Sequence, residues 1–358
     1  MEQATFHQLL GAAVRNSASD VHFKVGSPPA LRINGALRPI KAPALAPEDL
    51  LRICGYILKS SRYRGSLEEC TEADASYALE GVGRFRSAIF RQKNHLACVM
   101  RAIPLTVPNF DKLGLPKVLE KIAGEERGLI LVTGVTGSGK SSTLAAIVDW
   151  INTHDRKHIL TIEDPIEFIH EDKISRVTQR EVGPDTPSFS EALKSALRQD
   201  PDVILLGEMR DLETIETAMR AAETGHLVLS TVHTTDAART VNRLLGAFPT
   251  EAQSGVRQRL CESLRAIVSQ RLLPHAKGTG RVLAAEILIN TLSVTEYIKE
   301  PGRIEAIKDY LEKSHDLYGT QSFDQHLAIL YKEEKISLET AKSAASNPAD
   351  FERALNFE

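Results

Sequence analysis

Residues Gly134 to Ser142 read GVTGSGKSS and directly follow the apolar run Leu129-Ile-Leu-Val132. The segment matches the pattern G-x-x-x-x-G-K-[ST] in full. Glycines let the backbone turn tightly and point successive N–H groups inward, and the N-terminus of a following helix adds positive potential. The pattern therefore predicts a loop for nucleotide phosphates, with Lys140 at the β and γ phosphates and the Ser141 hydroxyl on Mg²⁺. The residues expected to surround the phosphates are Gly134, Thr136, Gly137, Ser138, Gly139, Lys140, Ser141 and Ser142.

An acidic segment, Thr161-Ile-Glu-Asp-Pro-Ile-Glu167, stands at the end of the next expected strand. Open α/β sheets bind their ligands at the carboxyl ends of their strands. We expect this strand to lie beside the phosphate loop, where the carboxylate of Glu163 would orient or deprotonate the attacking water as a general base. Asp164 and Glu167 fit a solvated turn equally well, since exposed acids are common.

A second acid follows the apolar strand in Val203-Ile-Leu-Leu-Gly-Glu208. This is the shape of a Walker B strand, but Gly207 occupies the place of the usual aspartate. We expect Glu208 to hold Mg²⁺ through a bound water, because Mg²⁺ keeps several waters when few carboxylates are supplied. An acid that ends a buried strand next to a phosphate loop is costly without a cation, which disfavours a purely structural role.

A third cluster runs from Gly225-His226 to His233-Thr-Thr-Asp236 around an expected strand. A histidine at the end of a strand can sense the γ-phosphate and report it to the following helix. We expect this role for His233 and weigh it against a structural histidine. For His226 the two alternatives stay open.

Arginines form the fourth cluster, with Arg84 and Arg86 on one expected strand and Arg101 on another. In a phosphoryl-transfer site, an arginine from a neighbouring domain or subunit neutralises charge in the transition state. Taken alone, the three residues are better explained as surface arginines.

The elements that must position these residues fall into two groups. Residues 1–103 read as a small α+β domain, with a helix over 6–14, strands over 21–25, 30–34, 37–40, 76–79, 83–90 and 96–103, and a hairpin turn at Asn34-Gly35. Two prolines in Pro104-Leu-Thr-Val-Pro108 resist both helix and central strand, and they indicate a linker over 104–116.

Residues 117–358 form the second expected domain. Strand patterns over 129–133, 158–162, 203–206 and 226–231 alternate with helix patterns over 141–153, 188–198, 211–223 and 237–245. This alternation predicts an α/β fold with a mainly parallel sheet and helices on both faces. From Pro249 onward the pattern predicts chiefly helices, over 251–269, 294–299, 303–314, 322–334 and 337–345.

Composition narrows the class of protein. The 358 residues are 42% hydrophobic and 25% charged, as in ordinary globular chains large enough for two cores. No run approaches the ~18 apolar residues that span a bilayer, and the N-terminus lacks the pattern of a signal peptide, so we expect a cytoplasmic protein.

The four cysteines, Cys54, Cys70, Cys98 and Cys261, form no C-x-x-C pair, so we expect neither a zinc site nor disulfide bonds. The net charge of −3 gives no global attraction to nucleic acid.

Taken together, the motifs resemble the secretion and type IV pilus ATPases (GspE/PilB/PilT-like) and, among them, the PilT-type pilus retraction ATPases. The similarity extends over nearly the whole chain. Its segments are the Walker A box at 134–142, an Asp box at 161–167, an atypical Walker B box at 197–211, a His box at 223–234, and the motifs Ser19-Asp-Val-His22 and Gln179-Arg-Glu-Val-Gly183.

This resemblance implies a PAS-like domain followed by a RecA-like ATPase domain, with six copies in a ring. Such a ring uses ATP and Mg²⁺ to move an inner-membrane, PilC-like platform protein from the cytoplasmic face, which retracts pili and drives twitching motility. Arg86 and Arg101 align with the family's arginines that reach the neighbouring active site, and Arg198 matches an arginine near the phosphates. Lys194 stands where relatives usually have arginine, and a lysine cannot make the same bidentate contact, so no role is carried over to it.

Retraction is the expected direction. Assembly and secretion ATPases usually carry an extra N-terminal domain and a tetracysteine zinc insertion, and this sequence shows neither. Thr320-Gln-Ser-Phe-Asp-Gln325 matches a late motif of the retraction family, whereas Val294-Thr-Glu-Tyr-Ile-Lys299 only loosely matches another. An accessory PilU-like ATPase that acts with a paralogue, an assembly or type II secretion ATPase, and a motor for another appendage remain alternatives.

Two alternatives come from other classes of protein. A RecA-like nucleic-acid motor would need basic loops with aromatics, and no such run is present, so no nucleic-acid partner is expected. A non-hydrolysing regulatory subunit is disfavoured by Lys140, Ser141, Glu163 and Glu208.

Overall fold

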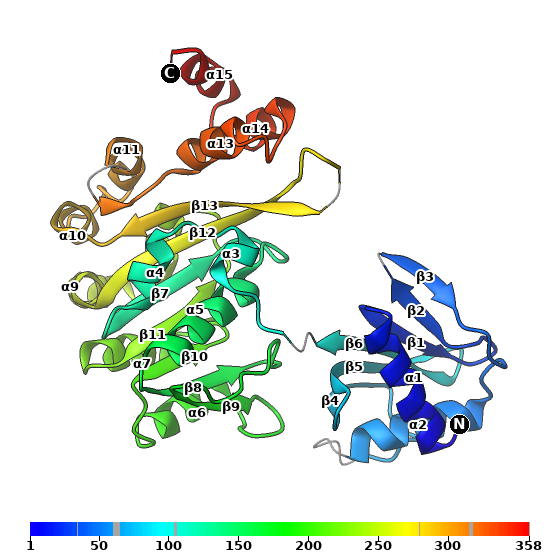
Figure 1. Cartoon of the computed structure of the whole chain (residues 1–358). Helices are drawn as coiled ribbons and strands as arrows, with labels where there is room; N and C mark the ends of the chain where they lie inside the picture. The colour runs from blue at the N-terminus through cyan, green and yellow to red at the C-terminus, as the bar shows by residue number, and fades with distance from the viewer. Residues whose placement is uncertain (34, 60–64, 104–105, 279, 315–317, 358) are drawn as a thin grey trace. The chain divides into compact units, whose positions relative to one another are not determined.

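The computed structural model describes residues 1–33, 35–59, 65–103, 106–278, 280–314 and 318–357 (Figure 1). The chain divides into two compact units. The first comprises Met1–Thr106 with Pro165–Ile169 and Gly183–Asp185, and the second comprises Val107–Asp164, His170–Val182 and Thr186–Glu358. Among the described helices, none is long and apolar enough to cross a membrane.

The first unit is a six-stranded antiparallel sheet in the order β3-β2-β1-β6-β5-β4. Helices α1 and α2 pack on one face of it through Phe6, Leu10 and Ile53, which have no exposed surface. Its elements are α1 (Gln3–Arg15), β1 (Asp20–Lys24), β2 (Ala30–Ile33), β3 (Ala36–Pro39), α2 (Pro47–Lys59), β4 (Glu72–Leu79), β5 (Gly83–Gln92) and β6 (His95–Ile103).

The two faces of this sheet differ because successive side chains of a strand point to opposite sides. Val21, Phe23 and Phe85 point to the helices and are buried. The alternate positions of the same strands carry Asp20 and Arg86, so charged side chains occur on this second face.

The second unit is built on a seven-stranded sheet in the order β13-β12-β7-β11-β10-β8-β9. Every neighbouring pair is parallel except β12 and β13, which are antiparallel. The strands are β7 (Gly128–Thr133), β8 (His158–Glu163), β9 (Arg176–Glu181), β10 (Val203–Leu206), β11 (Leu227–Val232), β12 (Leu264–Pro274) and β13 (Arg281–Ile289).

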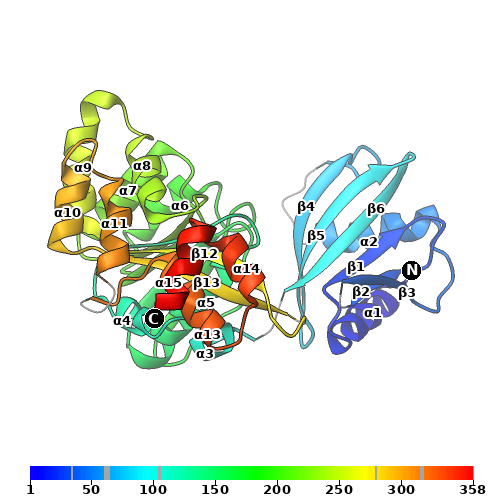
Figure 2. The ribbon, with the colours of Figure 1, turned by 90° about the horizontal axis from the view of Figure 1, so that it is seen from above.

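Helices cover both faces of this sheet (Figure 2). One face packs against α6 (Phe189–Ala196), α7 (Leu212–Glu223), α8 (Ala237–Leu245), α9 (Gln253–Ser263), α10 (Leu292–Lys299) and α11 (Ala306–Lys313). The other packs against α3 (Phe110–Leu113), α4 (Val118–Ala123) and α5 (Lys140–His154). A separate apolar cluster joins β13 to α13 (Phe323–Lys332), α14 (Leu338–Ala344) and α15 (Pro348–Phe357) (Figure 1). The predicted α/β class, with a mainly parallel sheet after a smaller α+β unit, is confirmed.

Several helices begin where the sequence places a capping side chain. Ser188, Asp211 and Asp236 each accept a hydrogen bond from the backbone N–H three residues later, at the starts of α6, α7 and α8. Such a bond satisfies one of the donors that the first helical turn leaves unpaired. These caps fix where each helix leaves the carboxyl edge of the sheet.

The prediction of a continuous helix over 251–269 is wrong. Helix α9 ends at Ser263, and the chain continues as the buried strand β12, which pairs with β7. A short apolar run such as Leu264 to Val268 fits a buried strand as well as a buried helix, so its periodicity did not distinguish the two. The hairpin of β12 and β13 and the helices α2 and α15 were not predicted.

Two other expectations concern the connections. Phe110 and Leu115 are buried in the core of the second unit, so part of the segment expected as linker belongs to that unit. Residues 104–105 of the linker and Asn34 of the expected turn lie outside the described residues. On either side of that turn, β2 and β3 pair with Ile33 opposite Ala36.

Candidate functional site

The glycine-rich loop follows β7, whose residues are all buried. Gly134 has φ 141°, and a Cβ there would lie 2.4 Å from Ser138 Oγ and 2.6 Å from the Gln270 carbonyl oxygen of β12. Any side chain at this position would therefore force the loop away from β12. Gly137 and Gly139 have φ 80° and 94°, in the left-handed region that favours glycine, and Gly139 is the N-cap of α5.

Lys140 is buried at the start of α5, with 8% of its surface exposed. Its Nζ donates to the carbonyl oxygens of Gly134 at 2.9 Å and Val135 at 3.1 Å. Burial lowers the pKa of Lys140, and the negative charge of Glu208 opposes that shift. The loop lysine and the second strand-end acid thus act on each other electrostatically.

Glu208 lies just beyond β10 with 14% of its side chain exposed. The Arg210 Nε is 2.6 Å from its Oε1, and the His233 Nε2 is 3.7 Å from its Oε2. Burial and the charge of Lys140 lower the pKa of His233, while Glu208 counteracts them. The structure therefore brings Lys140, Glu208 and His233 together, and it adds Arg210, to which the sequence analysis gave no role.

Glu163 is the last residue of β8. Its Oε1 accepts hydrogen bonds from Thr161 Oγ1 at 2.7 Å and from Gln179 Nε2 at 3.1 Å. The Gln179 side-chain oxygen in turn accepts from the backbone N–H of His170 at 2.8 Å. Gln179 stands in a segment typical of the family, but only the structure shows that it orients this carboxylate. Asp164 is exposed.

The expectation that the strand of Glu163 lies beside the phosphate loop is wrong. The neighbours of β7 are β11 and β12, and both β11 and β10 separate β7 from β8. Strand order in an open sheet is set by crossover connections, which local sequence patterns do not encode. Because β7, β11, β10 and β8 are parallel, the loop, His233, Glu208 and Glu163 still lie at the same edge of the sheet.

The loop suits an anionic ligand with a magnesium ion. Ser138 is 2% exposed, and its Oγ has no hydrogen-bond partner among the described residues. An orphaned buried hydroxyl in a glycine-rich loop at the start of a helix fits a phosphate oxygen. Thr136 and Ser141 are exposed and Ser142 is half-buried. The Ser141 hydroxyl and the Glu208 carboxylate are oxygen donors, the kind that Mg²⁺ prefers. In the described part of the chain, no three His, Cys, Asp or Glu side chains gather as a metal cluster.

The remaining predicted residues lie elsewhere. Arg198 is exposed, and its Nη1 donates to the Lys194 carbonyl at 3.2 Å. Arg86 and Arg101 belong to the first unit, directly opposite each other on β5 and β6 and both exposed. His226 is not at this edge, and its Nδ1 is 3.0 Å from the Ala221 carbonyl oxygen.

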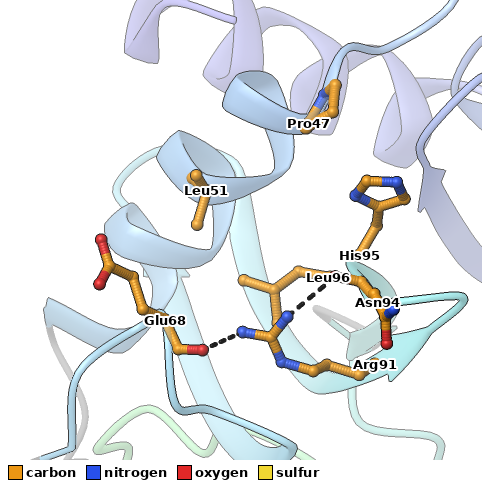
Figure 3. A pocket seen from close by; sticks show the side chains of 7 residues that line it. All are labelled: Pro47, Leu51, Glu68, Arg91, Asn94, His95 and Leu96. Carbon is orange, nitrogen blue, oxygen red and sulfur yellow. Dashed lines mark hydrogen bonds between the residues drawn. The ribbon is translucent and has the colours of Figure 1, made fainter.

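The first unit has a hollow of about 290 Å³ beside α2 and the hairpin of β5 and β6 (Figure 3). Its cationic residue, Arg91, donates to the backbone carbonyls of Cys70 and Asn94, at 2.8 and 2.9 Å, and also to that of Glu68. The guanidinium therefore ties β5 to the segment before β4.

A phosphate loop between a buried strand and a helix, at the carboxyl edge of a parallel sheet, defines a P-loop nucleotide-binding protein. The chain belongs to the family described as Type II/IV secretion system protein, whose model matches residues 2–354. It is 44% identical to the type IV pilus retraction ATPase PilT of Pseudomonas aeruginosa, over 96% of this chain and 99% of that protein. It is 38% identical to the type IV pilus ATPase PilU of the same organism, over 96% of this chain and 90% of that protein.

Solved structures agree with this assignment. The crystal structure of the pilus retraction motor PilT with bound ADP matches with a TM-score of 0.87 and 45% identity. The match covers 97% of this chain and 98% of that one.

Proposed function

We propose that this protein is an ATP-hydrolysing motor that powers type IV pilus retraction and twitching motility. One observation carries the proposal: the phosphate loop, its buried lysine and two strand-end carboxylates lie at the same edge of the parallel sheet. The relation to PilT over nearly the full length of both chains supports the direction of action. The lower identity to PilU makes an accessory role the second candidate.

The residues of the loop have distinct roles in this proposal. The backbone N–H groups over 134–142 bind the phosphates, and Lys140 exchanges its two carbonyl partners for phosphate oxygens. Ser141 and, through water, Glu208 hold Mg²⁺, which supplies charge neutralisation at the phosphates when it is bound. Arg198 precedes β10, at the edge of the sheet opposite the phosphate loop, so no contact with the phosphates of its own subunit is proposed for it.

Glu163 acts as the general base that receives a proton from the attacking water. Thr161 and Gln179 hold one of its oxygens in place, so that the carboxylate meets the water in a fixed orientation. His233 senses the γ-phosphate; in support, its Nε2 is 3.7 Å from Glu208 Oε2, and only residues 234–236 separate it from the start of α8.

The motor is a homo-hexamer in which Arg86 and Arg101 approach the nucleotide of a neighbouring subunit. The smaller unit, chiefly Met1–Thr106, supplies these arginines, and the larger unit, chiefly from Val107 onward, supplies the phosphate loop. The ring works at the cytoplasmic face of the inner membrane on a PilC-like platform protein, in company with a paralogous retraction or assembly ATPase. An arginine supplied by a neighbour neutralises the charge of the transition state and couples hydrolysis to movement between domains.

A lysine substitution tests this proposal in vitro. Lys140→Ala removes a charge-assisted contact to the phosphates, and we expect kcat for phosphate release to fall about 10²-fold or more. Lys121→Ala, at an exposed lysine of α4, is the control and is expected to keep the parental rate. Near-normal turnover of Lys140→Ala would refute the assignment of the loop.

A deletion tests the direction of action in cells. Without the gene, pili are expected to extend but never shorten, and the Lys140→Ala gene should not restore shortening. Cells that fail to assemble pili would support an assembly ATPase instead. Normal retraction in the deletion strain would support an accessory role.

A further inference from the structure

A row of charged side chains crosses the face of the first unit's sheet that is opposite to α1 and α2. Strand pairing places Asp20 of β1 directly between Arg32 of β2 and Arg101 of β6, and it places Arg86 of β5 opposite Arg101. Residues that face each other across neighbouring strands have their Cβ atoms about 4.5–5.5 Å apart. One carboxylate therefore lies between two guanidinium groups, and the third, that of Arg86, is next in the same line.

Asp20 is bound on both of its oxygens. Its Oδ1 accepts from Arg101 Nε at 2.9 Å, while Oδ2 accepts from Ser19 Oγ at 2.8 Å and lies 3.6 Å from Arg32 Nε. Only 6% of its side chain is exposed. Burial alone would raise the pKa of Asp20, but the Ser19 hydrogen bond and the Arg101 guanidinium outweigh burial and lower it. The group is therefore a fixed, ionised carboxylate.

Arg101 is bound through its Nε, and most of its side chain is exposed. The Nε bond to Asp20 is its contact with the carboxylate, whereas 69% of its side chain is exposed. A guanidinium has five N–H donors, of which the two terminal nitrogens carry four. In the described part of the chain the structure gives those terminal nitrogens no acceptor. An arginine anchored through Nε presents its two terminal nitrogens together, the geometry that binds a phosphate in a bidentate manner.

We propose that Asp20 is a positioning residue that orients Arg101 for the phosphates of a neighbouring subunit's nucleotide. This inference rests on the role in trans proposed above for Arg101. The carboxylate acts in two ways: it fixes the direction of the guanidinium, and it offsets the repulsion that Arg32, Arg86 and Arg101 would otherwise exert on one another.

The test is a double-mutant cycle on the full-length protein under conditions in which it assembles. Asp20→Asn should lower kcat for ATP hydrolysis about 10-fold, because a displaced guanidinium loses its alignment, with KM for ATP within about 2-fold of the parent. In an Arg101→Ala background, the same Asp20→Asn change should cost less than about 2-fold, because the two residues act as one unit. Asp74→Asn is the control, since Asp74 is an exposed carboxylate on the same face of the sheet.

The outcomes separate this inference from the proposed function. If Arg101→Ala keeps the parental kcat, the role of Arg101 in trans fails and the positioning role falls with it. If Arg101→Ala is impaired but Asp20→Asn is not, or if the two losses multiply, only the positioning role is overturned.

A second variant keeps the inference testable if Asp20→Asn does not fold. If Asp20→Asn lowers the unfolding temperature so far that no folded protein is obtained, Asp20→Glu keeps the charge but moves the guanidinium by one methylene. We expect Asp20→Glu to have a reduced kcat with an unfolding temperature near that of the parent. A parental kcat in Asp20→Glu would overturn the positioning role.

Discussion

The two strand-end glutamates have different surroundings, and their substitution should have different effects. Glu163 accepts hydrogen bonds from Thr161 and Gln179, whereas Glu208 faces Arg210 and His233 and interacts with the charge of Lys140. A carboxylate whose orientation is fixed by hydrogen bonds suits proton transfer from water. One surrounded by cations suits the binding of a metal-bound water.

We therefore expect the two glutamates to be separable by a binding measurement. Glu163→Gln should bind ATP with Mg²⁺ at nearly the parental affinity but hydrolyse it about 10² to 10⁴-fold more slowly, the usual contribution of a general base. Glu208→Ala should also lose the dependence of nucleotide affinity on Mg²⁺ concentration. Titration with a fluorescent nucleotide at several Mg²⁺ concentrations, followed by single-turnover hydrolysis, distinguishes the two. Hydrolysis at the parental rate by Glu163→Gln would place the base elsewhere.

At the scale of elements, a buried carboxyl group joins β13 to the start of α8. Glu286 is 6% exposed, and its Oε1 accepts from the backbone N–H of Ala237 at 2.8 Å. Burial raises its pKa from 4.5 to about 7, Asp236 adds to the shift, and Ala237, Arg271 and Lys308 oppose it. The folded state therefore binds this proton more tightly than the unfolded state does. Its contribution to stability is complete below pH 4.5 and is lost as the pH rises through about 7.

Glu286→Gln should remove that dependence. The amide oxygen can still accept from Ala237, and no charge has to be buried at high pH. We expect the unfolding temperature of the variant, relative to the parent, to rise between pH 5 and pH 8 by roughly 2–4 °C or more. Glu296→Gln on α10, at an exposed glutamate, is the control. A difference that stays constant with pH would show that Glu286 does not titrate in this range.

How far the sequence predicts these elements depends on how local their signals are. The loop over 134–142 and the helix α5 follow from a contiguous pattern, and the caps at Asp211 and Asp236 mark helix starts within one turn. Strand β12 was missed because its apolar run is short and its partner β7 lies far away in the chain. The separation of β8 from β7 was missed for the same reason, since only the three-dimensional arrangement decides which strands are neighbours.

The candidate site shows the same division. Lys140, Glu163, Glu208 and His233 were predicted, because a glycine-rich motif and strand ends mark them in the sequence. Arg210 and Gln179 were not, since a hydrogen bond to a carboxylate leaves no signal in residue spacing.

For the whole molecule, the proposed contribution of Arg86 and Arg101 in trans makes activity a property of the assembly. Specific ATPase activity should therefore rise with protein concentration as subunits associate. Mixing Lys140→Ala with Arg101→Ala should restore part of the activity, because hybrid interfaces pair an intact loop with an intact arginine. Phosphate release measured across mixing ratios checks this. Monomers that hydrolyse ATP as fast as the assembly would contradict it.

The contacts between β12 and the phosphate loop have a consequence for folding during synthesis. The backbone carbonyl oxygen of Gln270 lies against Gly134, and the side-chain Nε2 of Gln270 donates to Thr143 Oγ1 at 2.7 Å, across 127 residues of sequence. The Ser269 hydroxyl accepts from Thr133 Oγ1 at 3.0 Å. A ribosome-bound chain that ends before β12 contains the entire glycine-rich motif but lacks the β12 residues that contact it. Contacts of such long range form late, after the entropy of closing a large loop has been overcome. Nucleotide affinity should therefore arise only after β12 has left the ribosome, so ATP would stabilise complete chains and leave unfinished ones open to proteolysis.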